Sequence, residues 1–189
     1  MKRYRGTIIT IILFGLVLLF IFLFIYQYFG YNKYIYYGKD APIITELHPI
    51  VSAKSKELVE KANQKNISMV ITESFRSTER QDKLYAQGRK TEGNIVTHAQ
   101  GGESYHNYGL AIDFALEDEE GNYIWDTAYD GNGNHIADWD EIVIIAKELG
   151  FEWGGDWRSF KDYPHLQMTF GLSIKQLQRG LRPKTEIAE

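Results

Sequence analysis

The sequence of 189 residues contains no cysteine. This absence excludes disulfide bonds, iron–sulfur clusters, thiolate zinc sites and a cysteine nucleophile, so histidine, aspartate and glutamate remain to bind any metal ion. A strong excess of one charge is also missing, because 21 basic residues stand against 25 acidic ones and the net charge is −4. With 44% hydrophobic residues, this composition argues against a disordered chain and against a basic nucleic-acid-binding domain. We therefore expect a globular domain without a nucleic-acid partner.

Charged side chains are absent between residues 6 and 32, and residues 8–29 form a nearly continuous apolar run. As a helix, this run would be about 33 Å long, enough to cross a hydrocarbon core of ~30 Å. Lys2, Arg3 and Arg5 precede it, and the positive-inside rule then places the N-terminus in the cytoplasm. The sequence predicts a single transmembrane helix with the rest of the chain outside the cell. The alternative is a cleaved signal peptide and a secreted protein.

Changes in composition along the chain predict four segments. Residues 1–30 are interpreted as a basic tip and membrane anchor, and residues 31–46, which are rich in tyrosine and turn formers, as an extracellular stalk. Residues 47–180 are predicted to form the functional domain, and residues 181–189 a polar tail. The sequence has no internal repeat and specifies no oligomeric state.

Hydrophobic spacing predicts a mixture of helices and strands in the outer part. Helical periodicity indicates helices at 50–65 and 140–149, and a capping sequence at Ser77 and Thr78, with Gln81, predicts a third helix that ends near Gly88. Short β-rich runs predict strands at 67–71, 110–116, 151–153 and 165–168. There is no regular βαβ alternation, and the gaps between the later predicted strands have the length of hairpin loops. We therefore expect an α+β fold with a small antiparallel sheet.

Two histidines lie near carboxylate residues in the sequence, and together these residues suit a hydrolytic metal site. Such a site needs three histidine or carboxylate ligands, an open position, and a nearby carboxylate that does not bind the metal. His106 and Asp113 belong to one segment, and Asp162 and His165 to another. A spacing of seven does not place His106 and Asp113 on one face of a continuous strand, so we expect the chain to bend at Gly109. A single histidine is more often a surface or core residue than a metal ligand, so the prediction rests on the four residues together.

The motifs S-x-H-x-x-G-x-A-x-D, at residues 104–113, and D-x-x-H, at residues 162–165, resemble the zinc peptidases of the D-alanyl-D-alanine carboxypeptidase family. That family shares its fold with the hedgehog signalling domain. The segments ESFRSTERQDKLYAQGR, GGESYHNYGLAIDFA and FEWGGDWRSFKDYPH are similar to its L-alanyl-D-glutamate peptidoglycan endopeptidase branch, found in bacilli and in phage endolysins. The resemblance covers roughly residues 47–168.

The resemblance implies a role for six residues of this sequence. It implies zinc ligands at His106, Asp113 and His165, a general base at Asp162, an arginine facing the scissile carbonyl at Arg76, and a substrate contact at Ser104. Many members of the family carry glutamate as the base, so the shorter Asp162 departs from the common pattern. An accidental match would leave Arg76 as a solvated surface cation and Asp113 as an exposed strand residue.

A second cluster of oxygen donors lies at residues 130–141. Asp130, Asn132, Asn134, Asp138 and Glu141 occupy positions 1, 3, 5, 9 and 12 of a calcium loop of the EF-hand type. The glycine expected at position 6 is replaced by His135. A bound Ca²⁺ ion and a metal-free, turn-rich connection are both compatible with these residues.

Together the motifs predict a zinc metallopeptidase that cleaves the stem peptide of peptidoglycan, at the L-alanyl-D-glutamate bond, while anchored in the bacterial cell membrane. The alternative within the same chemistry is a D-alanyl-D-alanine carboxypeptidase. From a different class, a non-catalytic cell-wall-binding module would retain the pocket without turnover.

Overall fold

The computed structural model describes residues 2–31 and 33–185, with side chains placed for 11–25 and 33–185. The side chains of Lys2, Arg3 and Arg5, and residues 186–189 of the predicted tail, lie outside the described part. The described α-helices are α1 (Lys2–Tyr31), α2 (Pro49–Gln64), α3 (Thr78–Ala86), α4 (Asp138–Glu148) and α5 (Ile174–Gln178). The strands are β1 (Tyr34–Tyr36), β2 (Met69–Glu73), β3 (Ala111–Glu117), β4 (Tyr123–Ile124), β5 (Glu152–Trp153), β6 (His165–Gln167) and β7 (Leu181–Pro183), and the 3₁₀ turns are η1 (Gly38–Asp40), η2 (Tyr105–Tyr108) and η3 (Gly154–Asp156).

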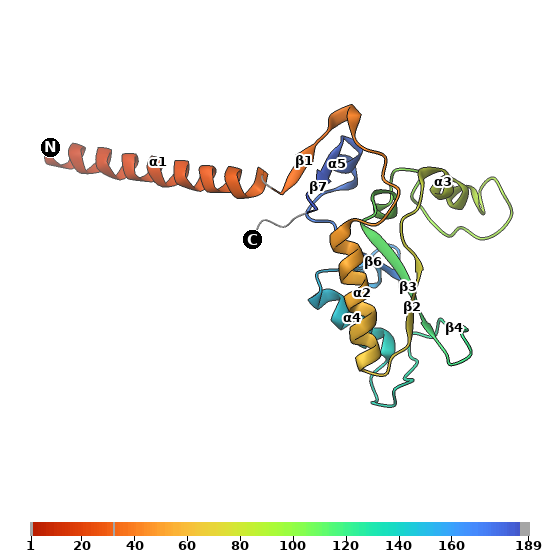
Figure 1. The fold of residues 1–189 in the computed structure, drawn as a ribbon. Helices are drawn as coiled ribbons and strands as arrows, with labels where there is room; N and C mark the ends of the chain where they lie inside the picture. The colour runs from red at the N-terminus through yellow and green to blue at the C-terminus, as the bar shows by residue number, and fades with distance from the viewer. Residues whose placement is uncertain (1, 32, 186–189) are drawn as a thin grey trace.

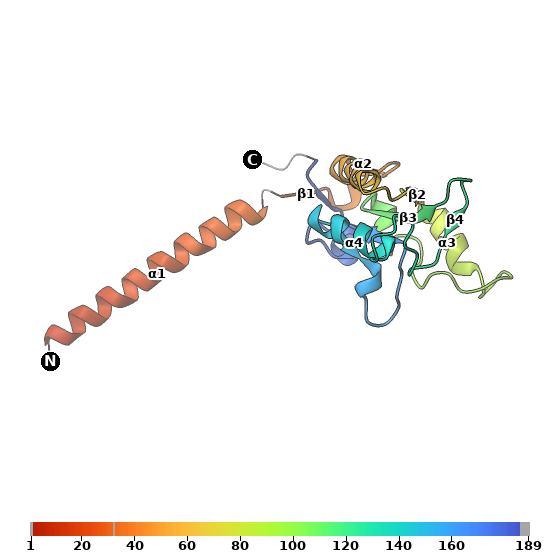
Figure 2. The ribbon, with the colours of Figure 1, turned by 90° about the horizontal axis from the view of Figure 1, so that it is seen from below.

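The main sheet has the order β2-β3-β6-β5, and β4 adds to the far end of β3 (Figure 1). Every pairing in it is antiparallel. The α+β fold class and the antiparallel sheet expected from the sequence are therefore confirmed. Helices α2 and α4 lie side by side along the sheet (Figures 1 and 2).

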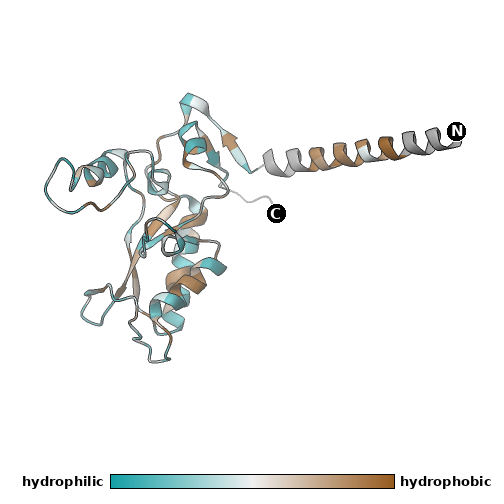
Figure 3. Ribbon diagram, turned by 180° about the vertical axis from the view of Figure 1, so that it is seen from behind, coloured by the Kyte–Doolittle hydropathy of each residue, from teal (hydrophilic) through white to brown (hydrophobic). Residues whose placement is uncertain are grey.

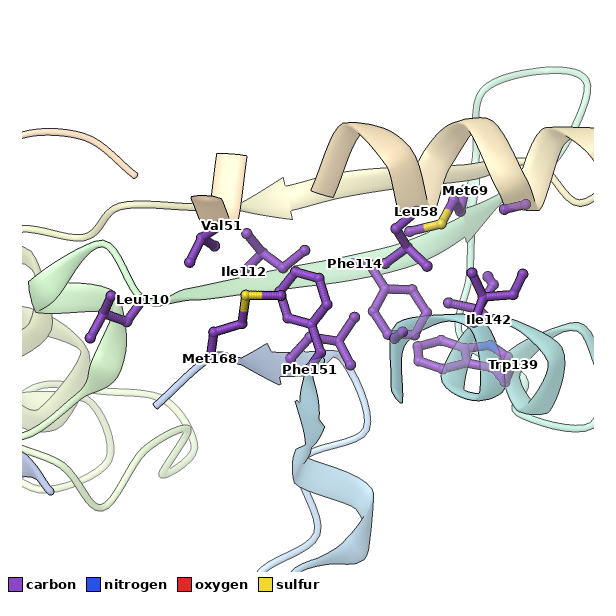
Figure 4. Close-up of a cluster of buried hydrophobic side chains, with 14 of the residues drawn as sticks. Val51, Leu58, Met69, Leu110, Ile112, Phe114, Trp139, Ile142, Phe151 and Met168 are labelled. Carbon is purple, nitrogen blue, oxygen red and sulfur yellow. The ribbon is translucent and has the colours of Figure 1, made fainter. Parts of the chain in front are cut away.

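The hydrophobic core lies between these two helices and one face of the sheet. Alternate β3 residues, Ile112, Phe114 and Leu116, point into it, because successive side chains of a strand point to opposite faces. Phe114 packs against Trp139 of α4 with ring centroids 4.6 Å apart (Figure 4). Apolar residues colour β3 and parts of α4, while the surrounding loops are mostly hydrophilic (Figure 3). The opposite face of β3 carries two alanines and the acidic residues Asp113 and Glu117.

A second, two-stranded sheet joins distant parts of the chain. Strand β1 pairs antiparallel with β7, so the segment that follows α1 lies against residues 181–183. The Tyr34 hydroxyl donates a 2.7 Å hydrogen bond to the carbonyl oxygen of Phe170. Gly180 is required here because a Cβ at this position would meet the backbone of Gly38. This small sheet fixes where the chain enters the α+β domain.

The expectation of a transmembrane helix is wrong. Among the residues that the structure describes, no helix is both long enough and apolar enough to cross a membrane. The predicted membrane partner and the single-pass location depended on this helix and are therefore not supported.

Candidate metal centre

Strands β3 and β6 place Asp113 and His165 directly opposite each other. Cross-strand partners of this kind have Cβ atoms roughly 4.5–5.5 Å apart, so their side chains meet. Each of the two residues is flanked by core residues that point the other way, Ile112 and Phe114 around Asp113 and Leu166 after His165. The strand period therefore puts both polar side chains on the face opposite α2 and α4.

His106 reaches the same point from η2, the turn before β3. Gly109 ends this turn in the left-handed conformation, with φ 66°, and the chain bends there as the spacing of His106 and Asp113 predicted. A Cβ on Gly109 would meet the carbonyl oxygen of Glu46, so only glycine fits. Ser104 caps the turn, because its Oγ accepts a 3.3 Å hydrogen bond from the His106 amide. The cap and the glycine together orient His106 towards the strand face.

The donor atoms of the three residues form a nearly equilateral triangle. His106 Nε2 lies 3.1 Å from Asp113 Oδ1 and 3.1 Å from His165 Nδ1, and the last two atoms are 3.2 Å apart. Ligands that share a tetrahedral zinc ion at 2.0–2.1 Å lie about 3.3 Å from one another. In the described part of the chain, these residues are the only group of three potential ligands that converge in this way. The donor set therefore fits one small divalent cation.

Hydrogen bonds on the outer sides of both imidazoles aim their inner nitrogens at this triangle. His106 Nδ1 lies 2.7 Å from the carbonyl oxygen of Ser74, and His165 Nε2 lies 3.0 Å from Gln167 Oε1. Both histidines are buried. Partners of this kind fix the tautomer and the ring orientation of metal-binding histidines.

The electrostatics of the cluster favour an ionised Asp113. Burial alone would raise the pKa of this carboxyl, but hydrogen bonds to His106 and His165, and electrostatic attraction to both rings, hold its pKa far below the usual range. Burial works against a charged His165, yet the hydrogen bond to Asp113 and the charges of Asp113 and Asp162 raise the pKa of His165. The cluster thus stabilises a positive charge at its centre.

Arg76 lies beside the triangle and is held from three sides. Its Nη2 donates a 3.1 Å hydrogen bond to Asp113 Oδ2, the oxygen that does not face the histidines. Nη1 donates to Gln81 Oε1 at 3.0 Å, and Nε lies 3.6 Å from Glu73 Oε2. The guanidinium group is therefore fixed against the Asp113 carboxylate.

Asp162 lines the same cleft as the three donor residues and Arg76. Burial raises its pKa, an effect that the charge of His165 opposes and that of Asp113 reinforces. Its carbonyl oxygen accepts a 3.3 Å hydrogen bond from the His165 amide, and its own amide donates to the Gly154 carbonyl. A Cβ on Gly154 would meet that Asp162 carbonyl oxygen, so glycine permits this close approach.

These residues lie in a cleft of about 890 Å³. Its walls come from the loop that follows α3 and from the loop between η3 and β6, where His98 contacts Phe160 edge to face with ring centroids 5.3 Å apart. Ser104 also lines the cleft. The structure therefore brings all six predicted site residues around one cavity.

Comparison with known proteins gives a consistent result. A family profile described as D-alanyl-D-alanine carboxypeptidase matches residues 97–168, which include five of the six site residues. A peptidoglycan L-alanyl-D-glutamate endopeptidase, CwlK of Bacillus subtilis (strain 168), is 62% identical over 130 residues, covering 69% of this chain and 78% of that protein. The chain belongs to the D-alanyl-D-alanine carboxypeptidase family of peptidases.

Two further relatives extend the comparison. An L-alanyl-D-glutamate peptidase of Listeria phage A118 is 30% identical over 136 residues, covering 71% of this chain and 42% of that protein. The solved structure of the LdcB LD-carboxypeptidase has a TM-score of 0.50 at 20% identity and covers 75% of this chain and 81% of its own. At this identity the structural likeness bears on the fold alone, and it agrees with a peptidase fold of this family.

Of the two interpretations of residues 130–141, the calcium loop is not supported. Asp130 uses both carboxylate oxygens to accept hydrogen bonds from the amides of Asn134 and His135. Glu141 accepts from Lys65 Nζ at 2.7 Å and from the side-chain amides of Asn132 and Asn134. Because protein donors already occupy these oxygens, the loop is closed by its own hydrogen bonds. His135 adopts the left-handed conformation, with φ 69°, at the position where an EF-hand loop has glycine.

Several residues around this peptidase site carried no motif signal. Gln81, which is fully buried, holds Arg76, and the Asn107 side chain donates a 2.9 Å hydrogen bond to the Arg76 carbonyl. Gln167 bonds to His165. Gln81 signalled only the start of a helix, whereas Gln167 stands two residues after His165 in a predicted strand and so shares its face.

Proposed function

We propose that this protein is a zinc-dependent peptidoglycan endopeptidase that hydrolyses the L-alanyl-D-glutamate bond of the stem peptide. The observation that carries the proposal is the triangle of donor atoms from His106, Asp113 and His165, with sides of 3.1–3.2 Å, beside a carboxylate in a cleft. The bond assignment rests on the names of the two endopeptidase relatives.

The donor set favours zinc over the hard cations. Two imidazoles and one carboxylate are ligands typical of Zn²⁺, whereas Mg²⁺ and Ca²⁺ prefer oxygen ligands. Three protein ligands that leave a position open are typical of catalytic rather than structural zinc. When bound, such an ion polarises the scissile carbonyl and acidifies water.

Asp162 is proposed to act as the general base. A base must lie within reach of the reacting group and work best with a pKa close to the operating pH. Burial raises the pKa of Asp162 towards that range, and the residue lines the same cleft as the ligands. The hydrogen bonds that join Asp162 to Gly154 and His165 fix its backbone close to the β6 ligand. In this role Asp162 takes up a proton at its carboxylate and releases it to the leaving amine.

Arg76 is proposed to stabilise the oxyanion. Asp113 and Gln81 anchor its guanidinium group. The group therefore needs to move little when negative charge develops on the substrate. Ser104 is proposed to contact the substrate. Its hydroxyl already accepts the His106 amide, and a hydroxyl oxygen retains a donor hydrogen for a peptide group in the cleft.

Mass spectrometry of purified muropeptides incubated with the full-length, zinc-loaded protein tests the proposal. Cleavage at the proposed bond separates muramyl-L-alanine from a peptide that begins with D-glutamate. Loss of a single C-terminal alanine would instead establish a carboxypeptidase and overturn the bond assignment. No product from a protein that contains zinc would favour a wall-binding module.

A metal-specific control completes this experiment. Removal of the ion with a chelator is expected to abolish cleavage, and stoichiometric Zn²⁺ to restore it. His106→Ala removes one of three ligands and is expected to lower both zinc content and cleavage. His98→Ala provides a matched control, because this histidine lines the cleft outside the donor triangle. Equal zinc content in the His106 variant and the wild type would contradict the proposed ligand set.

A further inference from the structure

His165 is the first member of a chain of side-chain hydrogen bonds that runs away from the metal centre. Its Nε2 lies 3.0 Å from Gln167 Oε1. Gln167 Nε2 donates a 2.9 Å hydrogen bond to Glu152 Oε2, and the Thr169 hydroxyl donates a 2.7 Å hydrogen bond to Glu152 Oε1. Gln167 is buried, so both ends of its amide are satisfied by protein groups.

The neighbouring strands β6 and β5 assemble this chain of contacts. His165 and Gln167 are two residues apart on β6 and therefore share a face, while Leu166 between them enters the core. Glu152 on β5 stands directly opposite Gln167 in the antiparallel register. The pairing of β6 with β3 thus places His165 against Asp113, and its pairing with β5 places a carboxylate against the amide of Gln167.

The polarity of these contacts determines which nitrogen of His165 carries the proton. A carboxylate only accepts hydrogen bonds, so the amide nitrogen of Gln167 must face Glu152. The amide oxygen of Gln167 must then face His165 Nε2, which can satisfy it only as an N–H donor. The lone pair of the neutral ring is consequently on Nδ1, the atom 3.1 Å from His106 Nε2 and 3.2 Å from Asp113 Oδ1.

His106 is fixed in the opposite tautomer by a contact with a backbone carbonyl group. Its Nδ1 faces the carbonyl oxygen of Ser74 at 2.7 Å, so Nδ1 carries the proton and the Nε2 lone pair points inward. The acceptor behind His106 belongs to the backbone and is independent of the side chain at position 74. The acceptor behind His165 is a side chain whose orientation depends on a second side chain.

We propose that Gln167 and Glu152 are positioning residues that hold His165 as its Nε2–H tautomer and so present Nδ1 to the metal. This inference rests on the proposed zinc function, and it concerns residues that do not bind the ion. Partners behind metal ligands of this kind typically contribute 10- to 100-fold to metal affinity.

The direct test on the wild type is ¹⁵N NMR of the zinc-loaded, full-length protein labelled at histidine. We expect a metal-bound Nδ1 and a protonated Nε2 for His165, with the reverse pattern for His106. A His165 signal that is protonated at Nδ1 would overturn the inference. This measurement requires no substitution and so does not depend on whether a variant folds.

We call the hydrogen-bonded chain of His165, Gln167 and Glu152 the relay. Variants test the relay through their zinc affinity, measured by competition with a chelating dye. Gln167→Met keeps the shape of the side chain but removes both hydrogen bonds, and we expect roughly 10- to 100-fold weaker zinc binding. Gln167→Glu alone places two carboxylates together and should bind zinc more weakly than the wild type. The exchange Gln167→Glu with Glu152→Gln rebuilds a relay of the same polarity, and we expect it to recover most of the affinity. Gln178→Met is the control for the same chemical change outside the relay.

The outcomes separate this inference from the proposed function. If the wild type neither binds zinc nor cleaves muropeptides, the proposed function fails. If the wild type does both, and Gln167→Met binds zinc as tightly as the Gln178→Met control, the relay fails while the function stands. Failure of the exchange variant to recover affinity over Gln167→Glu would likewise count against the relay.

Discussion

At the scale of single residues, Asp162 has the setting expected of the proposed general base. It lines the cleft, burial raises its pKa, and its backbone is hydrogen-bonded to Gly154 and His165. A surface aspartate would have none of these features. Perturbed carboxyl groups in a cleft are candidates for acid–base roles because their protonation changes near the working pH.

Asp162→Asn is expected to lower muropeptide cleavage by about 10²- to 10⁴-fold, since the amide has nearly the same shape but cannot take up a proton. Zinc content should stay at the wild-type level, because Asp162 is not one of the three converging donors. Elemental analysis together with product mass spectrometry measures both quantities. Asp156→Asn, at an exposed aspartate paired with Lys147, is the control. Retention of more than about a tenth of the wild-type rate would remove Asp162 from the mechanism.

Sequence reasoning at this scale found the residues with a motif and missed those without one. His106, Asp113 and His165 stand in a spaced pattern, whereas Gln81 bonds to the Ala99 carbonyl 18 residues away and Gln167 bonds to Glu152, 15 residues away. A glutamine is usually exposed, so the residue type alone does not mark it as buried. Its role becomes visible only when the sheet brings its partners together.

At the scale of elements, the segment from η3 to β6 depends on the absence of a side chain at Gly154. A Cβ there would meet the Asp162 carbonyl oxygen and would lie 3.1 Å from the Cβ atoms of Asp162 and His165. Two proposed functional residues therefore approach the backbone of η3 as closely as glycine allows. Any larger residue must displace the base, the ligand or both.

Gly154→Ala is expected to destabilise the metal-free protein by roughly 1–3 kcal/mol, the usual cost of inserting a methyl group into a packed region. The same change should weaken zinc binding, because the clash involves the His165 side of the metal centre. Urea unfolding and zinc titration measure the two effects. Gly15→Ala is the control, since a Cβ in this α1 position has no atom within 4 Å. Equal stability and affinity for the two variants would show that the segment adapts freely.

Helices and strands with a clear period were predicted well from the sequence. The predicted helices at 50–65 and 140–149 correspond to α2 (Pro49–Gln64) and α4 (Asp138–Glu148) within two residues. Strands β1 and β7, by contrast, have three residues each and pair across most of the chain. Three residues carry too little alternation to be recognised, and no sequence rule specifies a partner so distant.

At the scale of the whole molecule, the sequence predicted the fold class and the antiparallel sheet but was wrong about the membrane. A run of apolar residues shows only that a segment is hydrophobic, and among the residues that the structure describes no helix is both long and apolar enough to cross a membrane. The order of the strands could not be predicted, because it depends on core contacts between β3, α2 and α4 that composition does not encode. Long-range packing, rather than local pattern, decides these features.

His48 joins three distant parts of the molecule and should make its stability depend on pH. It precedes α2, and its ring packs against Phe170 with centroids 5.0 Å apart. Burial lowers the pKa of His48, and the neighbouring backbone of Lys184 and Pro183 partly opposes that effect. The folded protein therefore takes up this proton at a lower pH than the unfolded chain does.

The sign of the effect follows from this difference in proton binding. Above the unfolded pKa, near 6.5, both states hold a neutral ring and His48 causes no pH dependence. As the pH falls below 6.5, the unfolded chain binds the proton first, and the stability of the folded state decreases until the folded pKa is passed.

We expect the wild type to lose more stability than His48→Phe between pH 7.5 and pH 5, as measured by urea unfolding of both proteins. The metal-site groups are the same in both proteins, so their contribution to the pH dependence of stability cancels in the comparison. Identical pH profiles for the two proteins would show that His48 has the same pKa folded and unfolded. A steeper loss in the variant would reverse the sign and would indicate that the folded state favours the charged ring.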